Sequence, residues 1–257
     1  MQPLRIWAIA TNSFREVIRD RILYFVGVFA LILVVAARLL PEIAALTEDK
    51  ILLDVGIGTI TLIGVLLAAF AGTGTIAREI ERRTVAIALT KPMSRAEFIL
   101  GKYLGLWAAI GLAIAGMGLL YLALMSLLGI TYPLGALLIA LIYLLIELGL
   151  VVAIAIVFSI FTGSTLAGVL ALGIYLMGQL SRDWVELGKL SKNATIEAIT
   201  QGLYLVLPDL ARLNLRNEAV YGILPAPPDL LADAAYGLIY AGTLLAIATL
   251  IFSRRQF

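Results

Sequence analysis

The sequence predicts an all-α integral membrane protein with six transmembrane helices, and three observations support this fold class. The 257 residues are 62% hydrophobic and only 14% charged, with a mean hydropathy of +1.04. Soluble domains are usually about 45–50% apolar and about 25% charged, so most of this chain is expected to face lipid. Uncharged stretches of about 20 residues, the length that crosses a bilayer, recur along the chain. Turn-forming residues divide the longest of these stretches.

The positions of the spans follow from the charges and the turn residues. Between Tyr103 and Ser181 the only charged residue is Glu147, and at about 1.5 Å per residue this stretch is far too long for one crossing. Breaker signals at 129–133 and 161–165 divide it into three helices. The predicted spans cover residues 22–40, 55–77, 103–128, 134–161, 166–180 and 230–252. Because no internal repeat is present, residues 1–257 are expected to form a single transmembrane domain.

The distribution of charge predicts the orientation of the chain. An even number of spans places both termini on one side. That side, with the 78–102 loop, carries twelve Lys and Arg against five Asp and Glu, a net charge of +7, whereas the opposite side carries −4. Cytoplasmic loops are enriched in Lys and Arg, so both termini are predicted to be cytoplasmic. The expected location is the cell (inner or plasma) membrane.

Residues 1–21 precede the first apolar run and are predicted to form an amphipathic helix. Trp7, Phe14 and Val17 share one face, while polar residues such as Arg15 take the other. This pattern is typical of a helix that lies in the membrane interface. The alternative is a helix that continues the first span into the cytoplasm. No cleavable signal peptide is expected, because several charges precede the apolar run.

The absence of histidine and cysteine limits the chemistry of the chain. The usual ligands of zinc, haem and iron–sulfur clusters are missing, as are thiol nucleophiles and serine–histidine triads. We expect no metal site, no catalytic residue and no disulfide. Most enzyme chemistry known from membranes is therefore disfavoured.

The segment at 78–97 combines dense charge with helix signals. Pro92 has no main-chain N–H to donate to the preceding turn, and it disfavours the α conformation of the residue before it. A short helix over about 84–90 is therefore expected to end before Pro92. Ser94 with Glu97 three residues later is a capping-box pattern, which predicts a new helix that runs into the third span. A short charged helix between two rigid spans suits docking of a cytoplasmic partner. The alternative is a solvated loop that only follows the positive-inside rule.

This segment resembles the signature of the ABC type-2 permeases, the membrane subunits of a large class of ABC transporters. The matching residues are Glu79-x-Glu81-x-x-Thr84, a short apolar helix, and Pro92-x-Ser94-Arg95-x-Glu97-x-x-Leu100-Gly101-Lys102. The leader, Asn12-Ser13-Phe14-Arg15-Glu16 and on through Arg19-Asp20-Arg21, is similar to the start of the branch associated with multi-copper-enzyme maturation. Arg83 stands where glycine is common in the family.

The resemblance implies a permease subunit that couples ATP hydrolysis to the export of a substrate across or out of the membrane. In that family the loop contains a coupling helix, which sits in a groove of a separate ATPase subunit that binds ATP and magnesium. Two ATPase copies and a second permease copy, a homodimer, are implied, whereas no nucleic acid is expected as a partner. The implied ATPase-contact residues are Arg78, Glu79, Glu81, Arg82, Thr84, Ile87, Pro92, Ser94 and Arg95.

The chain has no phosphate loop of the form G-x-x-x-x-G-K-[ST], because Gly101-Lys102 is followed by Tyr103. It is therefore not expected to be an enzyme, and ATP hydrolysis is expected in a partner. Two other functions stay open. A stand-alone secondary transporter normally shows several intramembrane charges and repeated, broken helices, which are missing here. A non-transporting membrane scaffold or assembly factor is the other alternative.

Glu147 lies in the middle of the fourth predicted span, where an ionised carboxylate costs about 2.5–3.5 kcal/mol. One interpretation is a substrate or proton contact on the transport pathway, for which Glu147 and Tyr175 are the candidate residues. The other is a protonated or hydrogen-bonded strut between helices, with Tyr121 or Tyr175 as its partner.

Small residues at four-residue spacing indicate where the helices pack closely. Gly64, Ala68 and Gly72 form one ladder of small residues, and Gly101 with Gly105 begins another; both predict close helix packing, by default within one chain.

Residues 181–229 are too long for a plain connection. Their apolar spacing predicts short helices on the outer face, with a break near 207–212. The resemblance implies that this insert caps the outer end of the pathway; the alternative is a collar that only anchors helix ends.

Overall fold

The computed structural model describes residues 2–43, 48–81, 94–191 and 193–254, and every regular element in these ranges is helical. The elements are α1 (Pro3–Val17), the π-helical η1 (Ile18–Ile22), α2 (Leu23–Ile43), α3 (Glu48–Glu81), α5 (Arg95–Leu127), α6 (Leu134–Ser159), α7 (Ser164–Gln179), α8 (Ser181–Leu190), α9 (Ala194–Val206), the 3₁₀ helix η2 (Leu210–Arg212), α10 (Arg216–Tyr221) and α11 (Pro227–Arg254).

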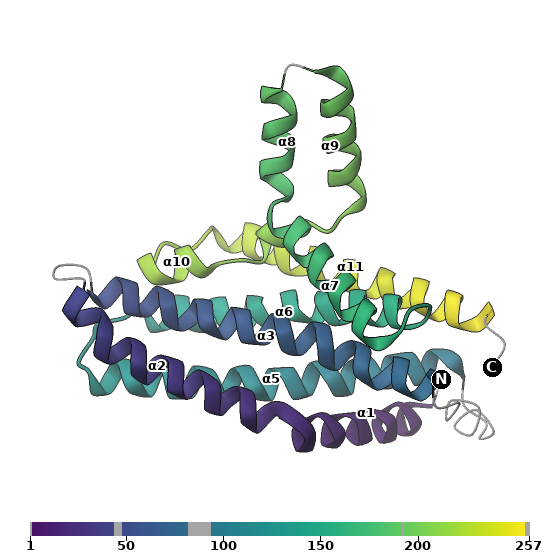
Figure 1. Cartoon of the computed structure of the whole chain (residues 1–257), viewed down its shortest axis with the longest axis horizontal. Helices are drawn as coiled ribbons and strands as arrows, with labels where there is room; N and C mark the ends of the chain where they lie inside the picture. Colours follow the sequence, from purple (N-terminus) through teal and green to yellow (C-terminus); the bar gives the residue numbers. More distant parts are fainter. Residues whose placement is uncertain (1, 44–47, 82–93, 192, 255–257) are drawn as a thin grey trace.

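Helix α6 forms the centre of the bundle, where it packs against α3, α5, α7 and α11 (Figure 1). All residues from 147 to 156 are buried. This stretch is apolar on every side except for Glu147, as expected for a helix that is surrounded by other helices. The central helix therefore places a single carboxylate inside the core.

The surface of the bundle is apolar along its length. Large side chains such as Leu31, Leu119 and Leu250 are each more than half exposed, at 65%, 70% and 62%. Contiguous apolar surface of this kind marks a face that meets lipid or another protein. The outer surface and the buried core are thus both hydrophobic, which fits helices in a bilayer.

Four helical segments are long and apolar enough to cross a membrane: Asp49–Gly74, Arg95–Leu127, Leu134–Ser159 and Pro227–Arg254. A fifth crossing results if α7 and α8, which meet at a bend of 59°, are taken as one span. The apolar part of α2, Leu23–Leu39, is shorter. Among the described residues, the structure therefore supports four or five of the six expected spans.

The predicted breaks between the central helices are confirmed. The chain turns between α5 and α6 at Gly129, whose φ of +70° lies in the left-handed region that glycine tolerates best. Between α6 and α7 it turns over residues 160–163. Helix α3 contains the predicted span 55–77 but begins earlier and ends later, at Glu48 and Glu81.

The leader is helical as predicted, and α1 packs against the first turns of α5 before continuing through η1 into α2. A Cβ atom at Gly105 would lie 2.4 Å from the Ala10 carbonyl oxygen and 2.8 Å from the Ser13 Cβ. A Cβ atom at Gly72 would lie 3.0 Å from that of Ala155 on α6. These glycines therefore form seams within one chain. The position of α1 relative to the membrane stays a prediction.

Helices α8 and α9 pack against each other as a hairpin that stands off the side of the bundle (Figure 1). Short helices are therefore present in the predicted insert, residues 181–229. The predicted break is also present, because α9 ends at Val206 and η2 begins at Leu210. Their place on the outer face stays a prediction.

Candidate functional site

The start of α5 borders the predicted coupling segment, and its local structure follows from two side chains. The Ser94 hydroxyl accepts a hydrogen bond from the main-chain N–H of Glu97 at 3.2 Å. The Glu97 carboxylate accepts one in return from the N–H of Ser94 at 3.0 Å. This reciprocal pair is the predicted capping box, and it starts the helix at Arg95.

The predicted ATPase-contact residues fall into three groups. Those in the last turn of α3 are Arg78, Glu79 and Glu81. Those at the start of α5 are Ser94 and Arg95. The expected coupling helix lies outside the described residues, together with Arg82, Thr84, Ile87 and Pro92.

Arg95 joins α5 to the last turn of α11. Its guanidinium donates hydrogen bonds to the carbonyl oxygens of Phe252 and Ser253, at 2.7 Å and 2.5 Å. The ring of Phe98, one turn along α5, stacks on that of Phe252 with centroids 5.7 Å apart. The end of the bundle next to the predicted coupling segment is therefore tied to α11.

The same end of α5 also holds α1. The Glu97 carboxylate accepts a hydrogen bond from the main-chain N–H of Gln2 at 2.7 Å. Further along, the buried ammonium of Lys102 lies 3.8 Å from the Glu16 carboxylate. One short stretch of α5 thus contacts α1 and α11, which the sequence separates by more than two hundred residues.

A second candidate site surrounds Glu147, which is 1% exposed. Its carboxylate accepts a hydrogen bond from the side-chain amide of Gln179, at the end of α7. The same amide nitrogen lies 3.3 Å from the Tyr175 hydroxyl oxygen. The Gln179 carbonyl oxygen accepts a hydrogen bond from the Asn214 amide at 3.2 Å. A chain of polar groups therefore leads from the centre of α6 to the segment before α10.

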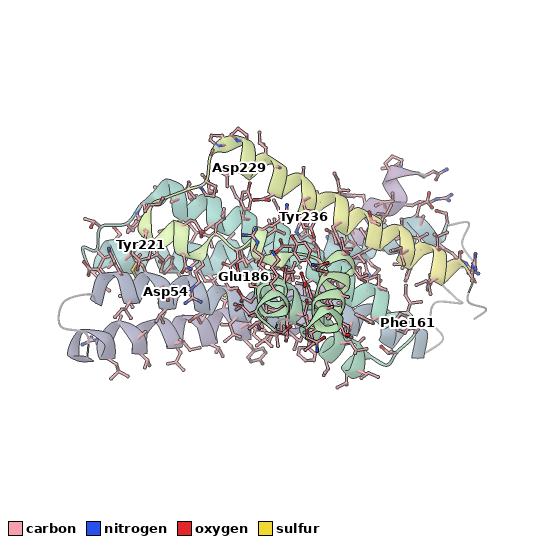
Figure 2. The ribbon with its side chains drawn as sticks, turned by 90° about the horizontal axis from the view of Figure 1, so that it is seen from above. Asp54, Phe161, Glu186, Tyr221, Asp229 and Tyr236 are labelled. Carbon is pink, nitrogen blue, oxygen red and sulfur yellow. The ribbon has the colours of Figure 1, made fainter. Side chains whose placement is uncertain are left out.

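An ion pair between α3 and α10 lies beside this chain. Arg216 binds both carboxylate oxygens of Asp54, with Nε 2.6 Å from Oδ1 and a terminal nitrogen 2.7 Å from Oδ2. Gly58, one turn further along α3, gives the guanidinium its space: a Cβ there would lie 2.6 Å from the guanidinium carbon. Figure 2 shows Asp54 near Tyr221 at one end of the bundle, with Phe161 at the other.

Two cavities border this ion pair. The larger has a volume of about 330 Å³ and a mostly polar lining of Asp54, Gln179, Ala211, Asn214, Arg216, Asn217 and Glu218. The smaller, of about 10 Å³, is lined by Ile57, Thr61, Ala140, Leu144, Glu147, Leu213, Asn214, Leu215 and Arg216. The second volume is about what one water molecule requires.

Asp209 anchors the root of the α8–α9 hairpin. Its carboxylate accepts hydrogen bonds from Ser181 at 2.8 Å and from Arg212 at 2.9 Å, and its main-chain N–H donates to the Tyr236 hydroxyl at 2.8 Å. Burial acts to raise the pKa of Asp209, but these hydrogen bonds and the charges of Arg182 and Arg212 outweigh it and hold the pKa below its ordinary value. Asp209 therefore links α8 and η2 through its anionic carboxylate, and α11 through its main-chain N–H.

Sequence reasoning identified Glu147 but missed most of its surroundings. Tyr175 lies in the cluster, whereas Tyr121, the other suggested partner, donates to the Leu53 carbonyl oxygen at 2.9 Å instead. The direct partner of the carboxylate is Gln179. Gln179 is uncharged and lies at the end of a predicted span, where polar residues are common. Its position in the sequence therefore gave no indication of a contact with Glu147.

The residues that the structure describes contain no group of three acidic side chains that could hold a metal ion. What they do contain is a bundle of apolar helices with an apolar outer surface and buried polar clusters around Glu147 and Asp209. The arrangement is that of a multi-pass membrane protein.

Comparison with known families identifies the class more closely. Residues 7–257 match the family described as ABC-2 family transporter protein. The chain therefore belongs to this family and is a membrane component of an ABC transporter rather than its ATPase. No curated protein matches the chain.

Proposed function

We propose that this chain is the permease subunit of an ATP-driven exporter, and that a separate ATPase subunit docks on residues 78–95. One observation carries the proposal. The segment is flanked by α3 and α5, which have 34 and 33 residues, and α5 begins there with a complete capping box. Long helices that start at a docking site can carry a displacement through the full thickness of a bilayer.

In the proposed mechanism, closure of two ATPase subunits pushes the 78–95 segments of two permease copies. ATP and magnesium are bound by the ATPase subunits. The contacts of Arg95 with α11 and of Glu97 with Gln2 support a movement that includes α1 and α11 as well as α3 and α5. The path lies between the two permeases, with Glu147 and Tyr175 beside it.

The proposed topology has six spans, with both termini in the cytoplasm and the α8–α9 hairpin outside the cell. Two observations support it: α2 has an apolar stretch, Leu23–Leu39, and α7 covers nearly all of the predicted fifth span without a charged residue. Gln2 and Ser253 both contact the first turn of α5, so the two ends of the described chain meet at one end of the bundle (Figure 1). The +7 charge of that side supports a cytoplasmic location for it.

Co-purification tests the proposed partner. We expect an affinity-tagged permease, expressed with the ATPase of a neighbouring reading frame, to retain that ATPase in an equal number of copies. The double variant Glu79→Lys/Glu81→Lys is expected to lose the ATPase or its coupling to the permease. A matched control, Glu186→Lys/Glu197→Lys, makes the same charge change on the α8–α9 hairpin and is expected to retain both.

The results separate the alternatives. Transport by the purified chain without any ATPase would identify a secondary transporter. A stable complex without ATP-dependent movement of any substrate would favour a scaffold. Normal assembly and coupling of the Glu79→Lys/Glu81→Lys variant would show that the coupling site lies elsewhere.

A further inference from the structure

We propose that the polar cavity between α3, α7 and α10 binds a small hydrophilic solute that carries a positive charge, and that Arg216, held by Asp54, closes the way from this cavity to Glu147. The proposal rests on the proposed function in treating this region as part of a transport path.

The lining of the cavity indicates a hydrophilic solute. Of its seven residues only Ala211 is apolar. Asn214, Asn217 and Gln179 offer amide donors and acceptors, and Asp54, Arg216 and Glu218 add charges. Binding sites for apolar molecules are instead lined mainly by apolar side chains with few polar groups. A lipid chain would leave these polar groups without hydrogen-bond partners.

The charges indicate a cation. Arg216 is paired with Asp54, so these two cancel. Glu218 remains at the cavity wall, with no ion pair among the described residues, so the lining keeps one uncompensated negative charge. A cavity with one sign of net charge concentrates the opposite charge.

Arg216 and Asn214 form the partition between the two cavities, because both line the larger cavity and the smaller void beside Glu147. The other residues around the void, such as Ala140 and Leu144 on α6, do not touch the larger cavity. A solute that passes from one space to the other must therefore displace the Arg216 side chain or move α10.

The pair that holds the partition is suited to opening. The side chains of Arg216 and Asp54 are 38% and 42% exposed, so water can replace each partner at small cost. Gly58 lies against the Arg216 guanidinium and has no side chain that could enclose it. At this position of α3 the guanidinium is therefore held by the Asp54 carboxylate alone.

Cysteine labelling tests the partition directly, because the natural chain has no cysteine. Ala211→Cys places a thiol in the larger cavity, and Ala140→Cys places one at the void, where the native side chain is 4% exposed. Both variants are treated in detergent with a cationic and an anionic methanethiosulfonate reagent. In this format the orientation of the protein in a membrane is irrelevant.

We expect Cys at position 211 to react about tenfold faster with the cationic than with the anionic reagent, after correction for their rates with a free thiol. Cys at position 140 should react slowly with both. Adding Arg216→Ala should raise the labelling rate at position 140 about tenfold. Gly58→Ala, which displaces the guanidinium without changing the charge, should raise this rate by a smaller factor. Arg182→Ala removes the same charge outside the cavity and should leave the rate unchanged.

Equal rates for the two reagents at position 211 would overturn the charge preference. Labelling at position 140 that is fast from the start, or that stays slow with both Arg216→Ala and Gly58→Ala, would overturn the partition. These readouts need no ATPase. A failure of co-purification with a normal labelling pattern would therefore refute the proposed function alone.

Discussion

The guanidinium of Arg95 donates a 2.7 Å hydrogen bond to the main-chain carbonyl oxygen of Phe252, across 157 positions of sequence. The first residue of α5 thereby caps the last turn of α11. Carbonyl groups at the end of a helix have no partner within the helix, and the helix dipole attracts a cation there. The contact is a cap supplied by a different helix.

Arg95→Gln is therefore expected to lower the free energy of unfolding by about 1–3 kcal/mol, the range for hydrogen bonds that involve a charged group. Thermal unfolding of the purified chain in detergent measures this effect. Arg254→Gln, which removes an exposed arginine at the end of α11, serves as the control and should change stability much less. Equal effects of the two variants would mean that the cap contributes nothing.

The hydrogen bond between Gln179 and Glu147 predicts a double-mutant cycle. Gln179→Leu should destabilise the chain by about 1–3 kcal/mol, because the buried carboxylate loses its donor. Glu147→Leu should cost a similar amount, and the double variant less than the sum of the two. Additive losses in chemical unfolding would show that the two side chains are energetically independent.

Glu147→Gln separates the two roles of this residue. An amide can still pair with Gln179, so the fold should survive, with stability close to that of the natural chain. If the carboxylate contacts substrate or proton, ATP-dependent transport by the assembled complex is expected to be abolished. Unchanged transport would leave Glu147 as a strut between α6 and α7.

The seam between α1 and α5 predicts a strong difference between two glycines of one helix. Gly105→Ala places a Cβ 2.4 Å from the Ala10 carbonyl oxygen, so α1 must move away and stability should fall by about 1–3 kcal/mol. Gly116→Ala meets nothing within 4 Å and should raise stability by up to about 1 kcal/mol through helix propensity. A similar thermal midpoint for both variants would contradict this seam.

Asp209 predicts a dependence of stability on pH. Its pKa in the folded chain lies below the ordinary value of 3.8, so the carboxylate stabilises the fold above that pH, and the contribution is lost as the pH falls through the lowered value. The chain should therefore unfold at a higher temperature than Asp209→Asn at about pH 7, with a smaller difference at about pH 3. A difference that stays constant with pH would contradict the anionic role of Asp209.

Helix ends were predictable where the signal is local. The Ser94–Glu97 pair is a four-residue pattern, and it starts α5 where expected. Gly129 and the following Pro133 likewise mark the turn between α5 and α6. The end of α7 at Gln179 was also expected, because charged residues return at Arg182, whereas the size of the bend that follows, 59°, has no sequence signal.

The candidate sites were less predictable, because their contacts are distant in sequence. Glu147 stood out as a lone charge in an apolar stretch. Asp54 and Arg216 are 162 positions apart, and each reads as an ordinary charge at a helix end. Arg95 carried a signal for the coupling segment, yet nothing local indicates its hydrogen bond to Phe252. Pairings of this kind are set by how the helices pack.

The π-helical residues Ile18–Ile22 change the helical phase between α1 and α2. A residue in an α-helix turns the chain by about 100°, and a π turn contains one residue more than an α turn. The buried stripe of α1 therefore does not run straight into that of α2, and each part faces its own neighbour, α5 for the first and mainly α3 for the second. Deleting one residue from this stretch would restore a regular helix and put the two stripes out of register. The leader and the first apolar helix would then be unable to keep both sets of contacts.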